Sequence, residues 1–337
     1  MNHAYWAYGL TLSSDNPVPG FCPETNSRVP DVVVELSPDP PVWVQQACNL
    51  PTSVRRGKGE ISDIIDPACK LTAFGAGEFF ELAYGDGARF VIDSAGSRLW
   101  GTCSDLTTIE DLAVYLRGPV SGFLLQRRGV TALHASAVCF AEHAVVLCGH
   151  SEAGKSTTAA ALAMRGVPIL CDDIAALARQ EHSFYVEPAY PRICLWPNAV
   201  CDLFGAPDAL PRLTPTWEKR FLPLDGAMGV FEAHRRPLGV IYILAERDEV
   251  HAPRIEEIAP REAFLELVQN TYMNRFLDQK QRAAEFHTLS GIFAQVPVRR
   301  IVPHLHSSCI DDLCSLIMTD AVALISSRQS AMVLPAR

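Results

Sequence analysis

The stretch from Ala144 to Arg165 decides the fold: it reads AVVLC, then GHSEAGKST from Gly149 to Thr157, then TAAALAMR. The apolar run at its start has the composition of a buried strand, and the helix formers at its end, stopped by Gly166, predict a helix. Between them lies the pattern G-x-x-x-x-G-K-[ST], which in this strand–loop–helix context predicts a phosphate-binding loop. The alternative is an ordinary glycine-bearing turn before a helix, which the flanking elements disfavour.

The residue types of this loop explain why it would bind a nucleotide. Its glycines allow the backbone to wrap around phosphates, so that successive N–H groups and the helix N-terminus face the anion. Lys155 is expected to reach the outer phosphates, and the hydroxyl of Ser156 is expected to enter the ligand shell of a Mg²⁺ ion. The predicted nucleotide-binding residues are Gly149, His150, Ser151, Glu152, Ala153, Gly154, Lys155, Ser156 and Thr157.

The composition of the 337-residue chain argues against several classes of protein. A net charge of −9 disfavours a nucleic-acid partner, because phosphate backbones are bound by an excess of basic residues. The N-terminus lacks the features of a signal peptide, and no apolar run approaches the ~18–20 residues that cross a membrane. Eleven cysteines without a C-x-x-C pair favour a reducing compartment. We therefore expect a cytoplasmic protein with no membrane partner.

The first 118 residues predict a smaller, mixed α+β N-terminal domain. Short strand-like runs alternate there with turns that contain proline and glycine. The expected strands are 8–12, 32–36 and 89–93, the expected helix is 108–116 with Thr107 or Thr108 as its cap, and the expected surface loops are 38–41 and 53–64. No catalytic pattern occurs in this region, so recognition of a substrate is the role left open for it.

Gly118-Pro119 marks the predicted boundary with an α/β catalytic domain at 119–325, and residues 326–337 are expected to form a frayed tail. Strands and helices alternate in this second region, which favours an α/β core. The expected strands are 131–140, 144–148, 167–172, 237–245 and 298–302, and the expected helices are 120–128, 157–165, 261–272, 278–296 and 310–317.

Candidate catalytic residues lie on both sides of the loop. Asp172-Asp173 ends an apolar run, and open α/β sheets gather ligand groups at the carboxyl ends of their strands. In a phosphoryl transferase one such acid helps to hold Mg²⁺, and the other accepts a proton from the attacking hydroxyl. A polar strand end or a helix cap is the alternative for this pair. His134 lies in an apolar strand, where a structural histidine is the more common finding.

The order of these features resembles the catalytic domain of HPr kinase/phosphorylase. The matching segments are LHASAV at 133–138, the loop at 149–156, T-A-x-x-L at 158–162 followed by Arg165-Gly166, and IL-x-DD at 169–173. The resemblance implies a phosphoenolpyruvate carboxykinase-like fold and transfer of a phosphoryl group from ATP to a serine hydroxyl. It also implies that Asp172 accepts the serine proton, that Asp173 and Ser156 hold Mg²⁺, and that His134 supports the catalytic carboxylate.

Outside this core the sequence departs from the classical members of that family. Their Glu-Ile-Arg-Gly-Leu-Gly signature is replaced at 190–197 by a segment that keeps Arg192 but lacks the metal-binding acid. This segment, Lys219-Arg220 and Asn270-Thr271-Tyr272 instead resemble a divergent branch found with lasso-peptide biosynthesis, which modifies the C-terminal serine of a precursor peptide. In a phosphoryl transferase, Arg192 and Arg220 would neutralise charge on the transferred group, and Lys219 would act on the nucleotide. A solvated charge pair is the alternative for Lys219 and Arg220.

The sequence thus predicts an ATP- and Mg²⁺-dependent serine kinase whose partner is a peptide or small protein. The classical relatives add the expectation of a homo-oligomer. Two alternatives remain open. One is a kinase that acts on a sugar or hydroxy amino acid, and the other is an ATP-binding regulator without transfer activity, which the missing metal-binding acid would explain.

Overall fold

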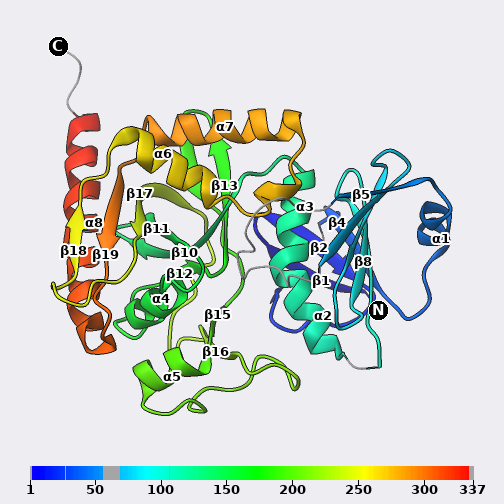
Figure 1. Cartoon of the computed structure of the whole chain (residues 1–337), viewed down its shortest axis with the longest axis horizontal. Helices are drawn as coiled ribbons and strands as arrows, with labels where there is room; N and C mark the ends of the chain where they lie inside the picture. Colours follow the sequence, from blue (N-terminus) through cyan, green and yellow to red (C-terminus); the bar gives the residue numbers. More distant parts are fainter. Residues whose placement is uncertain (1, 27, 56–68, 106, 334–337) are drawn as a thin grey trace. The chain divides into compact units, whose positions relative to one another are not determined.

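The computed structural model describes residues 2–26, 28–55, 69–105 and 107–333 (Figure 1). The chain forms two compact units. Unit 1 comprises Met1–Val130, Leu213–Glu218 and Met273–Arg282, and unit 2 comprises Thr131–Arg212, Lys219–Tyr272 and Ala283–Arg337. The first division therefore falls after Val130 and not at Gly118-Pro119.

Unit 1 is built on a nine-stranded sheet. Its strands are β1 (His3–Ala7), β2 (Leu10–Ser14), β3 (Cys22–Pro23), β4 (Val32–Leu36), β5 (Thr52–Arg55), β6 (Lys70–Phe74), β7 (Phe79–Ala83), β8 (Arg89–Asp93) and β9 (Arg98–Thr102). They lie in the order β3-β1-β2-β4-β9-β8-β7-β6-β5. β4 pairs in parallel with β2 and β9, and the remaining neighbours pair antiparallel. The sheet thus mixes hairpins with crossovers.

The predicted strands of unit 1 are found with small shifts. β4 and β8 have the predicted limits. β2 begins at Leu10 because Tyr8 and Gly9, with φ of +57° and +77°, form the turn that follows β1. The predicted loop at 53–64 starts inside β5, which ends at Arg55, and residues 56–64 lie outside the described residues.

The helices of unit 1 include α1 (Val42–Cys48), α2 (Ile109–Tyr115), α3 (Ser121–Arg127) and the short turn η2 (Asn274–Phe276). Thr108, one of the two predicted caps, caps α2 and forms a capping box with Asp111. The π-helical segment η1 (Leu116–Val120) joins α2 to α3, and Gly118 has φ −97° and ψ −109° there. Gly118-Pro119 is therefore a kink within a helical segment, which explains why it is not a boundary.

Unit 2 contains an eight-stranded mixed sheet. Its strands are β10 (Ala132–Phe140), β11 (His143–Gly149), β12 (Ile169–Cys171), β13 (Ile174–Gln180), β14 (Ser183–Val186), β17 (Arg236–Leu244), β18 (Arg254–Glu256) and β19 (Val298–Val302). β10 pairs antiparallel with β11 on one side and with β12 and β13 on the other. β17 pairs in parallel with β11 and β19. The α/β core is therefore confirmed, with β10 at the centre of the strands that carry the predicted site.

Several elements of unit 2 were not predicted. They are β13, β14, β18, the two-stranded sheet of β15 (Arg192–Leu195) and β16 (Arg220–Pro223), and helix α5 (Pro197–Phe204). The other helices are α4 (Lys155–Ala163), α6 (Pro260–Gln269), α7 (Gln279–Phe293), which belongs to unit 2 from Ala283, the turn η3 (Ser307–Cys309) and α8 (Ile310–Val333). α6 ends at Gln269, so the predicted helix at 261–272 is three residues too long.

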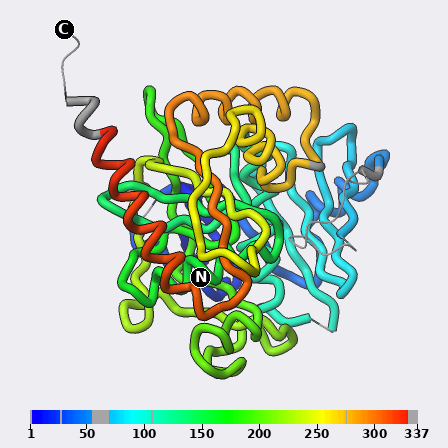
Figure 2. The backbone as a smooth tube through the Cα atoms, turned by 60° about the vertical axis from the view of Figure 1, so that its left-hand side comes forward, coloured from blue at the N-terminus to red at the C-terminus, as the bar shows by residue number. Residues whose placement is uncertain are grey.

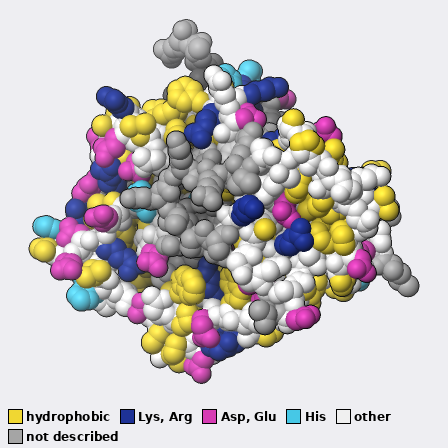
Figure 3. Space-filling model, turned by 45° about the vertical axis from the view of Figure 1, so that its right-hand side comes forward, with side chains coloured by type: hydrophobic (Ala, Val, Ile, Leu, Met, Phe, Trp, Pro, Cys, Tyr) yellow, Lys and Arg dark blue, Asp and Glu magenta, His cyan; other side chains and the backbone are white. Residues whose placement is uncertain are grey.

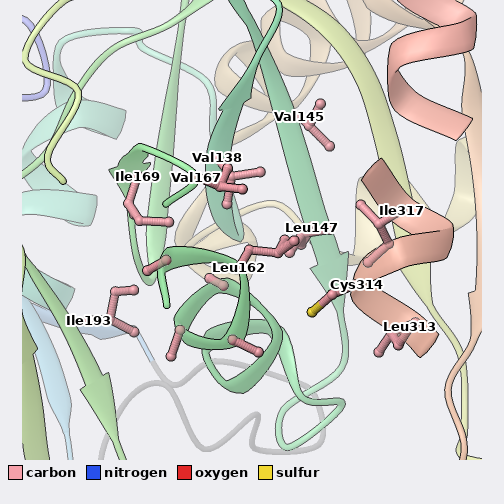
Figure 4. Packing of buried hydrophobic residues seen from close by; sticks show 14 of the residues in the cluster. Val138, Val145, Leu147, Leu162, Val167, Ile169, Ile193, Leu313, Cys314 and Ile317 are labelled. Atoms are coloured by element: carbon pink, nitrogen blue, oxygen red, sulfur yellow. The ribbon is translucent and has the colours of Figure 1, made fainter. Parts of the chain in front are cut away.

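The main apolar core of unit 2 forms where α4 packs on the sheet. Leu162 of α4 and Leu147 of β11 point toward one another, and Ile317 of α8 lies at the other side of the cluster (Figure 4). The small residues Ala159, Ala160 and Ala161 are fully buried, and their size allows α4 to approach the strands closely. This packing fixes the start of α4, and with it the end of the loop that precedes the helix.

The predicted frayed tail is wrong as far as Val333. Helix α8, predicted only for 310–317, continues to Val333, and Figure 2 shows most of it as one long red helix along unit 2. Leu313, Cys314, Ile317, Ala321 and Ile325 bury one stripe of the helix at helical spacing. The stripe extends past the predicted end of the helix at 317 as far as Ile325, so packing holds the helix over this length; 334–337 lie outside the described residues.

The charge on the surface and the length of the helices bear on contact with a membrane. On the face in Figure 3, basic and acidic side chains are interspersed. Among the residues that the structure describes, no helix has the length and apolar character needed to cross a membrane.

Candidate functional site

The loop between β11 and α4 begins with a glycine whose place no larger residue could take without a shift of the backbone. Gly149 has φ +150°, and a Cβ built on it would lie 2.8 Å from the carbonyl oxygen of Leu244 on the parallel neighbour β17. Gly154 has φ +102° and directly precedes α4. Both predicted glycines are therefore needed for backbone conformation or close approach.

Lys155 closes this loop from within. The residue is 6% exposed, and its Nζ donates to the carbonyl oxygens of Gly149 and His150, both at 2.8 Å. Burial lowers the pKa of Lys155 to about 8, although the carboxylates of Asp172 and Asp173 act in the opposite direction. A buried cation is thus held at the start of the glycine loop.

The N-terminus of α4 also favours an anion. Gly154 is the N-cap, and within the described residues no side chain caps this helix. The N–H groups of a first helical turn lack partners inside the helix, and the helix dipole adds positive potential there. The side chain of His150 is 68% exposed, and its Nε2 lies 3.9 Å from Glu266 Oε2, so His150 belongs to the outer side of the loop.

Asp172 connects three segments of unit 2 and is only 1% exposed. Its Oδ1 accepts hydrogen bonds from the hydroxyls of Ser136 and Ser156, both at 2.7 Å, and its Oδ2 accepts one from the backbone N–H of Cys194 at 2.8 Å. The pairing of β10 with β12 and β13 runs in register past this point and sets Ser136 opposite Asp172. Ser156 therefore joins Asp172, whereas the resemblance in the sequence pairs it with Asp173.

Asp173 lies at a sharp turn and is more accessible than its neighbour. Its φ is +72°, and the N–H of Ile174 donates to the carbonyl oxygen of Asp172 at 3.0 Å. Such conformations are strained and cluster at functional sites. The side chain is 31% exposed; Oδ1 lies 3.3 Å from His134 Nδ1, and Oδ2 accepts a hydrogen bond from the hydroxyl of Tyr272 at 3.3 Å. His134 thus neighbours Asp173, not Asp172 as the resemblance implies.

Burial and charge set different protonation tendencies for these groups. Burial raises the pKa of Asp172 in spite of its three hydrogen bonds. Burial also lowers the pKa of His134, which favours the neutral imidazole. At Asp173 burial is outweighed by the contact with His134 and by the charges of Lys219 and Lys155, so the pKa of this carboxyl is lowered. Asp173 is therefore the more acidic and the more accessible of the two carboxyl groups.

The two predicted arginines make contacts around the two-stranded sheet. Arg192 of β15 stacks its guanidinium 4.2 Å from the centroid of the Phe221 ring on β16. Arg220 of β16 donates to the carbonyl oxygen of Leu210 at 3.4 Å. Both side chains are partly exposed. Both arginines therefore lie on the two-stranded sheet, whose strand β15 also carries Cys194, the donor to Asp172.

Lys219 is the predicted cation that acts electrostatically on the site. Its Nζ lies 4.8 Å from the centroid of the Trp196 ring, in cation–π geometry. Its charge helps to lower the pKa of Asp173. Trp196 is 51% exposed, so this pair presents a large aromatic surface near an ionised carboxylate.

Three residues of the site lie in segments that carry the sequence resemblance but were not predicted as site residues. Ser136 lies two positions after His134, so strand alternation places both on one face of β10, which is a local signal. Asn270 accepts the N–H of Gly149 through Oδ1 at 3.0 Å, and Tyr272 contacts Asp173. These two contacts span 121 and 99 positions of sequence, so local periodicity could not indicate what either side chain would meet.

The donor set around Asp172 fits a magnesium ion. Mg²⁺ prefers oxygen ligands and commonly takes only one or two from protein, with phosphate oxygens and water completing its shell. Ser156 and Asp172 offer a hydroxyl and a carboxylate that already lie together. Among the described residues, no group of three or more His, Cys, Asp or Glu side chains could hold a metal ion. Glu187, an acid near this region in the sequence, lies 3.7 Å from Arg235 instead.

Comparison with known proteins finds likeness among solved structures alone. No family model matches the chain, and no curated protein matches it. Among solved structures, the chain is similar to the Hpr(Ser) kinase/phosphatase from Coxiella burnetii, with 14% sequence identity and a TM-score of 0.31. That match covers 57% of this chain and 97% of the other. What the site can do chemically therefore rests on its own geometry.

Proposed function

We propose that this chain is an ATP- and Mg²⁺-dependent kinase that transfers the γ-phosphoryl group of ATP to the serine hydroxyl of a peptide or small protein. One observation carries the proposal. A glycine loop with a buried lysine stands beside two carboxylates in different surroundings, Asp172 bonded to Ser156 and Asp173 accessible beside His134. Phosphoryl transfer needs this combination of an anion cradle, a metal-holding acid and a proton acceptor.

The loop and Lys155 would bind the phosphates of ATP. The uncapped N-terminus of α4 supplies N–H donors, and the ammonium group of Lys155 supplies positive charge. Ser156 and Asp172 would hold Mg²⁺, which neutralises charge on the phosphate oxygens when it is bound. The hydrogen bond between these two side chains supports their joint role, in place of the Ser156–Asp173 pair inferred from the resemblance.

Asp173 would receive the proton of the acceptor hydroxyl. As the hydroxyl oxygen bonds to the γ-phosphorus, the bond from that phosphorus to the bridging oxygen of ADP breaks, and the proton passes to a carboxylate oxygen of Asp173. Its exposure supports this role, whereas Asp172 has both oxygens engaged. His134, favoured as the neutral form, would orient Asp173. Lys219 would contribute positive charge on the nucleotide side.

The sequence resemblance guides the choice of acceptor and family. We propose that unit 2 is a divergent HPr-kinase-like domain of the phosphoenolpyruvate carboxykinase-like type, on the motifs at 133–173. The segments at 190–197, 219–220 and 270–272 resemble the branch found with lasso-peptide biosynthesis. A precursor peptide with a C-terminal serine is therefore the first acceptor to test. A homo-oligomer and a cytoplasmic location belong to the same proposal.

The roles can be separated with Lys155→Ala, Asp172→Asn and Asp173→Asn in the full chain. Lys155→Ala should lose ATP binding in a calorimetric titration. Asp173→Asn should bind MgATP normally and transfer phosphate to a serine peptide about 10²–10⁴-fold more slowly, because the proton acceptor is gone. Asp172→Asn should lose the gain in ATP affinity that Mg²⁺ provides. Intact peptide mass after incubation with MgATP reports the transfer.

Other outcomes would redirect the proposal. If Asp172→Asn kept the Mg²⁺ effect and lost transfer while Asp173→Asn stayed active, the assignment from the resemblance would hold and the one from contacts would fall. Phosphorylation of sugars or hydroxy amino acids, with peptides unmodified, would favour a small-molecule kinase. Tight ATP binding without turnover on any acceptor would favour a nucleotide-binding regulator.

A further inference from the structure

The segment Asn270–Tyr272 pairs with the start of β10 as a short antiparallel neighbour. β11 pairs with β10 from Ala135 onward, and β13 occupies the other side of Ala132–His134. On the side that β11 leaves vacant, His134 N donates to Asn270 O at 2.7 Å and Tyr272 N donates to Ala132 O at 2.8 Å. The segment therefore lies where β11 would run if the chain did not turn into the glycine loop.

Asn270 fixes the point at which the chain enters that loop. The residue is 5% exposed, and its Oδ1 accepts the N–H of Gly149 at 3.0 Å. Its Nδ2 donates to the carbonyl oxygen of Glu266 in α6 at 2.8 Å, which orients the amide. The first residue of the loop is thus tied through one side chain to the C-terminal turn of α6.

Tyr272 contacts Asp173, the carboxylate proposed to accept the proton. It is 3% exposed, its hydroxyl donates to Asp173 Oδ2 at 3.3 Å, and its ring centroid lies 5.9 Å from that of His134. Thr271, between the two, turns its hydroxyl elsewhere, to Val268 O at 2.8 Å and Glu285 Oε1 at 3.1 Å. Alternation along three residues thus directs two side chains to the site and one away from it.

We propose that Asn270 and Tyr272 are positioning residues that set, from one segment, the phosphate loop on one side and the proton-accepting carboxylate on the other. This inference rests on the proposed kinase function. Asn270 acts through Gly149 and governs how well ATP is bound. Tyr272 acts through Asp173 and governs transfer.

The two roles predict different kinetic changes. Asn270→Ala leaves the N–H of Gly149 without its partner and should weaken ATP binding and raise the KM for ATP about tenfold, with kcat changed much less. Tyr272→Phe should leave ATP binding unchanged and lower kcat about tenfold. Thr271→Val is the matched control, because it removes a hydroxyl from the same segment that touches neither Gly149 nor Asp173.

The experiment measures MgATP binding by calorimetry and ADP formation from MgATP, with and without a mixed pool of synthetic serine peptides. Near-identical changes in both KM and kcat for Asn270→Ala and Tyr272→Phe would overturn the inference, as would an unchanged kcat in Tyr272→Phe. If the wild type forms no ADP, the proposed function fails on its own. The calorimetric arm then still decides for Asn270: affinity equal to that of Thr271→Val would overturn its role.

Discussion

At the scale of single residues, the site is organised by burial of charged groups. Lys155 and Asp172 are both almost inaccessible, and each is surrounded by partners that satisfy it. Removing such a group leaves those partners without a counterpart, which costs more than an exposed contact would. Asp173 differs because it is accessible. This difference is why we propose that Asp172 holds the metal ion and that Asp173 accepts the proton.

The burial of Lys155 leads to a pH-dependent prediction. Its pKa of about 8 in the free protein means that the ammonium form, which attracts phosphate, predominates below that pH and is lost above it. ATP affinity should therefore fall about tenfold between about pH 7 and about pH 9. Calorimetric titrations across this range check the prediction. Lys155→Met should bind weakly at every pH, and a flat wild-type profile would contradict the argument.

At the scale of elements, the strand–loop–helix unit was predictable and its surroundings were not. The limits of β11 and α4 lie within two residues of those expected, because hydrophobic pattern, helix formers and glycines all act locally. The turn at Asp173 depends instead on tertiary pairing, because β12 before it and β13 after it both pair with β10. Pairing partners of strands are not encoded in local periodicity, so β13 through β16 escaped prediction.

Two glycines on either side of α4 give a prediction at this scale. Gly149→Ala places a Cβ against Leu244 O at a positive φ, and it should lower the free energy of unfolding by about 2–4 kcal/mol. Gly166→Ala, just after α4, also has a positive φ but meets nothing within 4 Å, so a loss of about 1 kcal/mol is expected. Urea unfolding measures both. Equal losses would show that the close approach of Gly149 to Leu244 adds little to the cost of the substitution.

At the scale of the whole molecule, the chain does not divide into two consecutive halves. Leu213–Glu218 and Met273–Arg282 belong to unit 1 although their neighbours in sequence belong to unit 2. Within unit 1, Thr216 Oγ1 donates to the buried Asp111 at 2.5 Å, and Trp217 packs edge-on against Tyr115. The predicted boundary at 118 was derived from the Gly-Pro pair there. Such a local signal does not reveal that later segments of the chain pack into the first unit.

Thr216 gives a prediction about stability and its pH dependence. Thr216→Val removes a hydrogen bond from a buried carboxylate and should lower the free energy of unfolding by about 1–3 kcal/mol near neutral pH. At Asp111 burial is outweighed by hydrogen bonds, so its pKa is lowered; such a group stabilises the fold above its usual pKa, and this stabilisation is lost as the pH falls.

The difference between wild type and Thr216→Val should therefore shrink toward about pH 3 in urea unfolding. Thr319→Val on the exposed side of α8 is the control, since its hydroxyl bonds only within its own helix, to Ser315 O. A difference that stays constant with pH would mean that Thr216 does not act through the Asp111 carboxylate.

The sequence alone determined the glycine loop, its strand and helix, and the candidate acids and histidine, because each follows from residue type and spacing over a few turns of chain. Tertiary structure decided which of these residues meet. It joined Ser156 to Asp172 and His134 to Asp173, and it added Asn270 and Tyr272. The physical reason is that strand register and packing bring together positions up to 121 residues apart, and the free energy that selects those pairings is shared across the whole core.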